Sequence, residues 1–311
     1  MGTIKGLFLI EAPFQLLSAY EAIGDYNIRQ YIIIVRLSNT VNNDLQLKKL
    51  VDILFKNDKQ IKYISLSSQN KSLLEYLKAL YYIVYFCVYQ LKFSKIFFGN
   101  LESGFLSKII KLTKHNKIIL LDDGIKSITF QNKFSKNKFY NLYTMIDDLK
   151  SIPNQKIVIN KFNRLNRLLK NINYTDDIML IGSKLNEVGI IKESYYIKLI
   201  KEISRQYEGK KIKYIQHRGE NEEKLLKIDQ IKNIEVIKLE YPLEFYPLHS
   251  SLLPKTIVSF YSAALVSMGK LYSGSNMIAY RFNFTNYKHK ENIEESYKYL
   301  EKHIKVVDLN V

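Results

Sequence analysis

Cysteine is almost absent from this sequence, since Cys87 is the single one in 311 residues. One cysteine excludes an internal disulfide and fits a reducing compartment. The first residues lead straight into an apolar stretch, and no cleavable small-residue site follows an apolar core, so we expect no signal peptide. With 47% hydrophobic and 25% charged residues, the composition is typical of a globular protein. We therefore expect a cytoplasmic location and a fold that depends on its hydrophobic core.

Long apolar runs are also missing. The longest, residues 79–88, is shorter than the roughly 20 residues that a membrane-spanning helix needs. The tyrosines within this run, with Lys78 and Lys92 on either side, are typical of a buried helix or of a helix lying on a membrane surface. We predict a buried helix over residues 73–91.

Several catalytic and metal-binding motifs do not occur. There is no CxxC or HExxH motif, and the five histidines are scattered, so we expect no metal site. There is also no Walker loop, no GxGxxG and no GxSxG motif. These absences argue against a P-loop NTPase, a dinucleotide oxidoreductase and a typical α/β-hydrolase.

Positive charge is abundant. The chain carries 47 Lys and Arg against 30 Asp and Glu, a net charge of +17. Such an excess indicates a nucleic acid, an anionic membrane surface or an anionic substrate as partner. The basic residues form no dense tract, and aromatic–basic stacking motifs for RNA are missing. A nucleic-acid or polyanion-binding protein is therefore the weaker hypothesis, and peripheral contact with an anionic membrane stays open.

Short apolar runs alternate with helical patterns along the whole chain. We predict strands at residues 4–10, 31–35, 61–66, 96–98 and 118–121, and again at 178–181, 212–215, 234–239 and 256–260, with 277–282 and 306–309 completing the second set. This alternation predicts an α/β protein with doubly wound parallel sheets. The pattern restarts after a polar, basic stretch at 160–175. We therefore predict two Rossmann-like domains, 1–165 and 166–311, facing a central cleft.

Two adjacent carboxylates follow the strand at 118–121. Asp122 and Asp123 come directly after its apolar residues, and Gly124 allows a sharp exit. Open α/β sheets bind ligands at the carboxyl ends of strands, and two neighbouring acids tend to raise one pKa. The pair therefore suits a general base. Taken alone, such a pair more often caps the next element or lies in a solvated turn.

Polar groups follow two strands of the second half in the same way. His217 ends one strand and suits proton donation or binding of an anionic oxygen, although a lone histidine is more often an ordinary loop residue. Arg218 suits a phosphate clamp or a solvated position. Gly182 and Ser183 end another strand and offer backbone N–H groups and a hydroxyl.

A helix start and a second acidic segment complete the candidate set. Ser262 precedes Ala263 in a small-residue helix, whose first turn presents free N–H groups to an anion, although such a serine is usually just an N-cap. Glu244 suits hydrogen bonds to a ribose diol or a capping role. Glu240 and Tyr261, at the ends of their strands, belong to the same set of candidate ligand-binding residues.

Four short segments, taken in order, resemble motifs of bacterial sialyltransferases, with glycosyltransferase family 52, the lipooligosaccharide and capsule sialyltransferases, as the closest match. These segments are LLDDG at 120–124, IGS at 181–183, YIQH at 214–217 and SFYSAAL at 259–265. Each motif is short, so the specificity lies in their order along most of the chain. One departure is Arg218, because several relatives have proline after the histidine.

The resemblance implies a GT-B fold and an inverting, metal-independent transfer without a cofactor. The donor would be CMP-sialic acid or a related CMP-activated nonulosonic acid, and the acceptor a galactose-type hydroxyl of a lipooligosaccharide or capsule glycan. A GT-B transferase for another nucleotide sugar, such as a UDP-hexose, is the alternative. The oligomeric state stays open, a homodimer included.

The resemblance also implies residue roles. Asp122 is our first choice as general base and Asp123 the second, while His217 would stabilise or protonate the departing CMP phosphate and Ser262 would bind it. Further roles are implied in the nucleotide pocket for Gly182 and Ser183, at the ribose for Glu244, and towards the sugars for Pro13, Gln15, Gly99 and Asn100.

Overall fold

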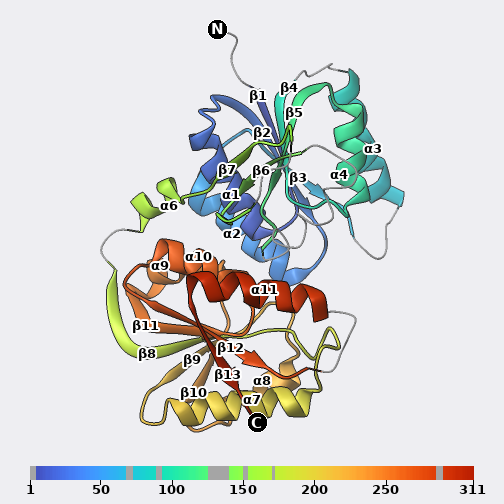
Figure 1. Cartoon of the computed structure of the whole chain (residues 1–311). Coiled ribbons are helices and arrows are strands. Elements are labelled where there is room, and N and C mark those ends of the chain that lie inside the picture. The colour runs from blue at the N-terminus through green and yellow to red at the C-terminus, as the bar shows by residue number, and fades with distance from the viewer. Residues whose placement is uncertain are drawn as a thin grey trace. The chain divides into compact units, whose positions relative to one another are not determined.

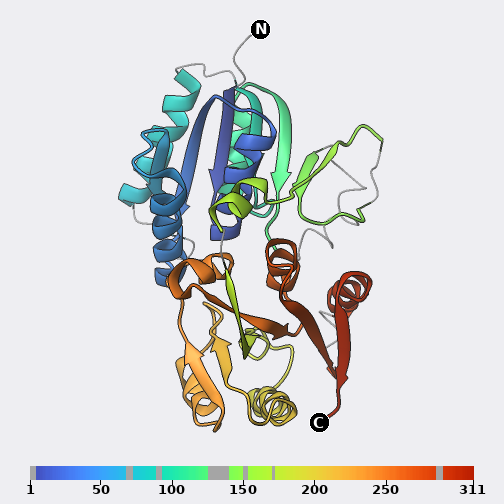
Figure 2. The ribbon, with the colours of Figure 1, turned by 90° about the vertical axis from the view of Figure 1, so that its left-hand side faces the viewer.

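The computed structural model describes residues 5–67, 73–88, 93–124, 140–149, 153–169, 172–284 and 290–311. The chain divides into two compact units (Figures 1 and 2). The first unit contains residues 1–165 together with Glu240–Pro242, and the second contains residues 166–239 and 243–311.

The first unit is built on a seven-stranded parallel sheet in the order β3-β2-β1-β4-β5-β6-β7. Its strands are β1 (Lys5–Ile10), β2 (Gln30–Leu37), β3 (Ile61–Ser65), β4 (Phe93–Phe98), β5 (His115–Leu121), β6 (Asn141–Thr144) and β7 (Ile157–Ile159). The strand order reverses between β1 and β4. Their carboxyl ends therefore flank the topological switch point at which open sheets of this type bind ligands.

Helices cover both faces of this sheet. They are α1 (Pro13–Asp25), α2 (Val41–Phe55), α3 (Leu73–Val88), α4 (Gly104–Leu112) and α6 (Asn163–Leu168), the last ending in the second unit. Leu7 and Leu9 point to the face that packs against Leu106 of α4. Phe8 points to the other face and stacks on Phe97, 4.4 Å between ring centroids. Because both faces are buried there, the central strands β1, β4 and β5 end in continuous apolar runs.

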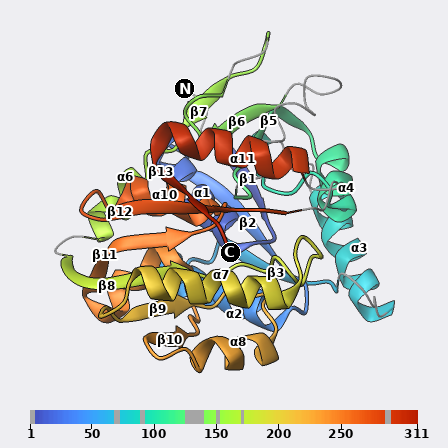
Figure 3. The same cartoon turned by 60° about the horizontal axis from the view of Figure 1, so that its bottom comes forward.

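The second unit has a six-stranded parallel sheet in the order β10-β9-β8-β11-β12-β13 (Figure 3). Its elements are β8 (Asn173–Ile181), α7 (Glu193–Gln206), β9 (Ile212–Ile215), α8 (Glu222–Asp229), β10 (Ile234–Ile237), the 3₁₀ helix η1 (Leu243–Phe245), α9 (Tyr246–Ser250), β11 (Leu252–Ser259), α10 (Ala263–Leu271), β12 (Asn276–Phe282), α11 (Lys290–His303) and β13 (Lys305–Leu309). The order reverses between β8 and β11. The predicted α/β class with two doubly wound parallel sheets is confirmed.

No strand was predicted between residues 130 and 154, but β6 lies there and pairs with β5 and β7. Residues 125–139 and 150–152 lie outside the described part of the chain. The helix predicted around the longest apolar run is present as α3, and those of its apolar side chains that the structure describes are exposed. In the described residues, no helix is both long and apolar enough to cross a bilayer.

Candidate functional site

Glu11 organises the carboxyl edge of the first sheet. It directly follows β1, and its Oε1 accepts hydrogen bonds from Arg36 of β2 at 2.5 Å and from the Ser103 hydroxyl at 2.8 Å. Its Oε2 accepts from the Asn100 side-chain amide at 2.8 Å. This carboxylate therefore ties together the ends of β1, β2 and β4. The role of Glu11 was not predicted, because this residue lies in a loop with no motif around it.

Gln15, in the first turn of α1, links this edge to the acidic pair. Its Oε1 accepts from the Glu11 backbone N–H at 2.8 Å, and its Nε2 donates to Asp123 Oδ1 at 3.0 Å. Pro13 starts α1 in the first helical position and is buried. A Cβ on Gly99 would lie 2.3 Å from Gln15 Cδ, so glycine is required where Gln15 crosses the end of β4. Of the residues predicted to approach the sugars, Gln15 and Gly99 thus lie in contact and Gln15 reaches Asp123.

The two aspartates have different environments. Asp122 is 1% exposed, and its Oδ2 accepts from the Met145 backbone N–H at 2.5 Å, which fastens the end of β5 to the end of β6. Asp123 is only half-buried. The backbone then turns at Gly124 with φ of +75°, a conformation that favours glycine. Of the two carboxylates, Asp123 is therefore the one with exposed surface, whereas our first choice from the sequence was Asp122.

A buried lysine lies at the corresponding edge of the second sheet. Lys224 of α8 has no exposed side-chain surface, and its Nζ lies 2.8 Å from Glu187, 2.8 Å from Glu220 and 2.9 Å from Asn186. It also lies over the Tyr196 ring, 4.2 Å from the centroid. Three oxygen partners and a ring face compensate for the loss of water around the ammonium group.

Glu220 is the second centre of this network. Its Oε1 accepts from the Tyr214 hydroxyl at 2.5 Å, and its Oε2 accepts from the His217 backbone N–H at 2.7 Å. Burial raises the pKa of Glu220, against the opposing effect of Lys224. Burial also acts to raise the pKa of Glu187, but its hydrogen bonds to Lys224 and to a backbone amide outweigh this, so that pKa is lowered.

Gly182 and Ser183 serve this network as well. A Cβ on Gly182 would lie 2.3 Å from Glu220 Oε2 and 2.7 Å from the Tyr214 hydroxyl, so the glycine leaves room for these side chains. The Ser183 backbone N–H donates to the Tyr196 hydroxyl at 3.0 Å. We expected both residues to offer backbone groups to a nucleotide. Instead, Gly182 is buried and the Ser183 amide has an internal partner.

His217 is half-buried at the end of β9. Its Nδ1 accepts from the Gly219 backbone N–H at 3.0 Å, so the proton of the neutral ring resides on Nε2. Burial, followed by the positive charges of Arg218, Lys184 and Lys224, lowers its pKa to about 4. At neutral pH the ring is uncharged and suited to donate a hydrogen bond to an oxyanion. Proton donation by an imidazolium, the other role we predicted, is not favoured.

The loop that precedes α10 contains the predicted serine motif. The Ser262 hydroxyl accepts from the Ala264 backbone N–H at 3.3 Å and caps α10, and Ala263 is half-buried. Beside it, the Tyr261 ring packs edge-on against Tyr297, and burial raises the pKa of Tyr261. The backbone N–H groups of Ala264 and Leu265 in this first turn therefore have internal acceptors, the hydroxyl and the carbonyl of Ser262.

Two predicted donor ligands have other partners. Glu244 is 5% exposed and accepts from the Ser267 hydroxyl of α10 at 2.6 Å, and burial raises the pKa of Glu244. It therefore stabilises α10 from the protein interior. A ribose ligand would be expected at an open edge of the sheet, where Glu244 does not lie. Glu240 groups with the first unit, where its carboxylate pairs with Lys49. Arg218 is exposed, as a phosphate clamp would require.

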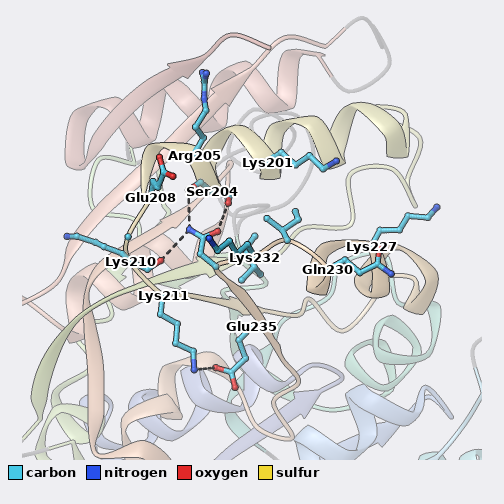
Figure 4. Close-up of a pocket in the computed structure, with 14 residues that line it drawn as sticks. Lys201, Ser204, Arg205, Glu208, Lys210, Lys211, Lys227, Gln230, Lys232 and Glu235 are labelled. Atoms are coloured by element: carbon cyan, nitrogen blue, oxygen red, sulfur yellow. Dashed lines mark hydrogen bonds and ion pairs between the residues drawn. The ribbon is translucent and has the colours of Figure 1, made fainter.

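A large open groove lies elsewhere on the second unit. It measures about 1140 Å³ and lies at the amino ends of β9 and β10, so it is at the sheet edge opposite the candidate site (Figure 4). Several of its cations are paired: Lys211 with Glu235 at 2.8 Å and Lys227 with Glu193 at 2.6 Å. No predicted site residue lines this groove. Among the described residues there is also no cluster of three or more His, Cys, Asp or Glu side chains that would hold a metal ion.

Comparison with known proteins was informative only at the level of structure. No protein-family model matches the sequence, and no curated protein matches it. A solved structure assigned as a UDP-N-acetylglucosamine 2-epimerase, from Listeria monocytogenes, covers 97% of this chain and 89% of its own, with a TM-score of 0.56 and 13% identity. A UDP-glucosyltransferase from Polygonum tinctorium covers 100% of this chain and 86% of its own, with a TM-score of 0.56 and 7% identity.

The chain has the GT-B fold. A further structure with this fold, the UDP-GlcNAc 2-epimerase from Methanocaldococcus jannaschii in complex with UDP-GlcNAc and UDP, covers 96% of this chain and 92% of its own, with a TM-score of 0.54 and 15% identity. At such identities the likeness shows the GT-B fold alone. The GT-B fold itself was predicted from the resemblance to sialyltransferases and is confirmed.

Proposed function

We propose that this protein is a glycosyltransferase that uses a nucleotide-activated sugar. The observation that carries the proposal is the half-buried carboxylate of Asp123, held at the carboxyl edge of a GT-B sheet by Gln15 of α1, the helix that follows β1 at the switch point. A general base for an acceptor hydroxyl needs such a positioned, accessible carboxylate. The structural neighbours add support, because one was solved with UDP-GlcNAc and UDP and another is described as a UDP-glucosyltransferase.

The donor in this proposal is CMP-sialic acid or a related CMP-activated nonulosonic acid. The support is the ordered series of short segments that resemble motifs of bacterial sialyltransferases, the last of which contains the α10 N-terminus. Such a donor carries a carboxylate and a phosphate, which the net charge of +17 would attract. The proposed acceptor is a galactose-type hydroxyl of a lipooligosaccharide or capsule glycan, and the proposal includes no metal ion and no cofactor.

The proposed mechanism is a single displacement with inversion. Asp123 accepts the proton of the acceptor hydroxyl while that oxygen bonds to the anomeric carbon. The bond between this carbon and the CMP phosphate oxygen breaks, and the electron pair leaves with CMP. The Nε2–H of His217, the Ser262 hydroxyl and the positive end of the α10 helix dipole stabilise the charge that develops on the phosphate.

A UDP-hexose transferase is the second candidate. It is favoured by the names of the structural neighbours, which act on or bind UDP-linked sugars. Each candidate predicts a different nucleotide as product, so the nucleotide alone distinguishes them.

The decisive test is incubation of the purified protein with CMP-sialic acid, UDP-glucose, UDP-GlcNAc or GDP-mannose, with and without lactose. Chromatography would then identify the released nucleotide and any new oligosaccharide. Release of CMP, unchanged by EDTA and lost in Asp123→Asn, supports the proposal. Turnover of UDP-sugars alone would refute the CMP donor, and conversion of UDP-GlcNAc without transfer would show an epimerase instead.

A further inference from the structure

Helix α3 exposes an apolar stripe to solvent. The exposed fractions are 76% for Leu73, 52% for Leu77, 43% for Leu80 and 47% for Val84. These four residues recur every three or four positions, so they share one face of the helix. The stripe is widened by three more exposed side chains on adjacent positions, Leu74 at 62%, Tyr76 at 53% and Tyr81 at 65%. So many large apolar side chains on one helix face mark an interaction surface.

The orientation of α3 is fixed by polar contacts on its other side. Glu75 accepts from the Asn39 side-chain amide at 3.0 Å and from the Ser67 backbone N–H at 3.5 Å. In Figures 1 and 3, α3 lies at the outer edge of the first unit. The apolar stripe therefore faces away from the sheet that α3 covers.

The neighbouring helix α4 adds exposed positive charge. Lys108 and Lys111 of α4 and Lys114 just beyond it are exposed, and none of the three forms an ion pair within the described residues. Leu112, between them, is 52% exposed. Apolar and tyrosine side chains beside lysines are the combination with which peripheral helices bind anionic bilayers.

We propose that the α3 stripe and the α4 lysines dock the protein on the surface of an anionic lipid bilayer. Charge decides between this partner and a second copy of the chain. A symmetric contact through α3 would bring two sets of the same lysines together, whereas anionic headgroups neutralise them. Tyrosine side chains suit the depth of the headgroups, where their rings are in apolar surroundings and their hydroxyls in water. This docking does not depend on the reaction proposed above.

Vesicle flotation tests the docking surface directly. The full-length protein would be mixed with vesicles of phosphatidylcholine, with or without phosphatidylglycerol, and centrifuged. We expect the wild type to float with the anionic vesicles, and the variant Leu77→Glu/Val84→Glu to bind at least about tenfold less, because it places charge where the helix enters the bilayer. Lys108→Glu/Lys111→Glu should also bind less, and its residual binding should depend less on salt.

The matched control is Leu226→Glu, which changes a leucine of α8 that is 66% exposed. It should bind like the wild type. Circular dichroism would verify the fold of each variant, and Leu77→Ser/Val84→Ser provides a milder pair. Absence of wild-type binding, or equal binding by the Leu77/Val84 variants, would overturn the proposal. So would a wild-type dimer in light scattering that these variants dissociate, because the stripe would then be covered by a second copy.

Discussion

The side-chain amide of Gln15 donates a 3.0 Å hydrogen bond to Asp123 Oδ1, although the two residues are separated by 108 positions in the sequence. This contact joins α1 to the loop after β5 and fixes the direction of the half-buried carboxylate. Asp122, one position earlier, is turned inward to the Met145 amide. Two adjacent residues of the same type therefore have separable roles.

Substitution should distinguish these roles. Asp123→Asn removes the proposed base, and we expect kcat to fall by roughly 10²–10⁴-fold with unchanged stability. Asp122→Ala leaves the buried Met145 N–H without its acceptor and should lower the free energy of unfolding by about 1–3 kcal/mol. Donor turnover and urea denaturation of both variants provide the measurements. Equal activity loss with equal stability in the two variants would contradict the assignment.

The positioning role of Gln15 predicts an effect at Gly99. In Gly99→Ala the new methyl group would overlap the Gln15 side chain, which must then move away from Asp123. We expect Gly99→Ala and Gln15→Ala to lower kcat by a similar factor, about tenfold, since the carboxylate loses its orientation in both. Gly104→Ala is the matched control, because nothing lies within 4 Å of a Cβ at that position. Wild-type kinetics in Gly99→Ala would rule out this coupling.

Two lysines of α8 should differ strongly in their effect on stability. Lys224→Met leaves Glu220 and Glu187 without their buried cation and should lower the free energy of unfolding by about 3–5 kcal/mol. Lys227→Met removes an exposed pair with Glu193 and should change it by less than about 1 kcal/mol. Urea denaturation at neutral pH measures both. A small effect at Lys224 would mean that Glu220 is protonated in the folded protein at that pH.

His217 makes stability depend on pH in a defined direction. Its pKa is about 4 in the folded protein against an ordinary value of 6.5, so the unfolded chain binds the proton more readily. The contribution of the neutral ring is therefore complete above 6.5 and is lost as the pH falls towards 4. We expect His217→Gln to weaken this loss in urea denaturation measured across that window. In the wild type, NMR should show a neutral ring with the proton on Nε2, and a charged ring at pH 6 would contradict the structure.

The sequence predicted the sheets well because their central strands are buried on both faces. The last four residues of β1, β5 and β8 are all apolar, and the residue that follows each strand is polar or glycine. β6 was not predicted because its four residues, NLYT, carry no such run. It is a strand because β5 and β7 provide partners on both sides, which is information from the tertiary structure.

The candidate site was predicted by position more accurately than by role. Asp123, His217 and Ser262 lie at the strand and helix ends where the sequence placed them. Asp122 points inward because it accepts a hydrogen bond from the Met145 amide, and Gly182 leaves space for the Glu220 side chain. Neither partner could be recognised from the sequence, because both are distant in the chain from the residue they contact. The exposure of α3 was missed for a related reason, because an apolar run does not reveal whether its partner belongs to the same chain.

The buried ammonium group of Lys224 has a consequence for how anions reach the second unit. Its charge is balanced locally by the carboxylates of Glu187 and Glu220, so little of its field extends into the solvent. The long-range electrostatic attraction of an incoming phosphate therefore comes from two exposed cations near this edge, Lys184 and Arg218. Different cations thus attract the anion and stabilise the fold at this edge. Raising the ionic strength would slow the association of the anion without weakening the buried ion pairs of Lys224.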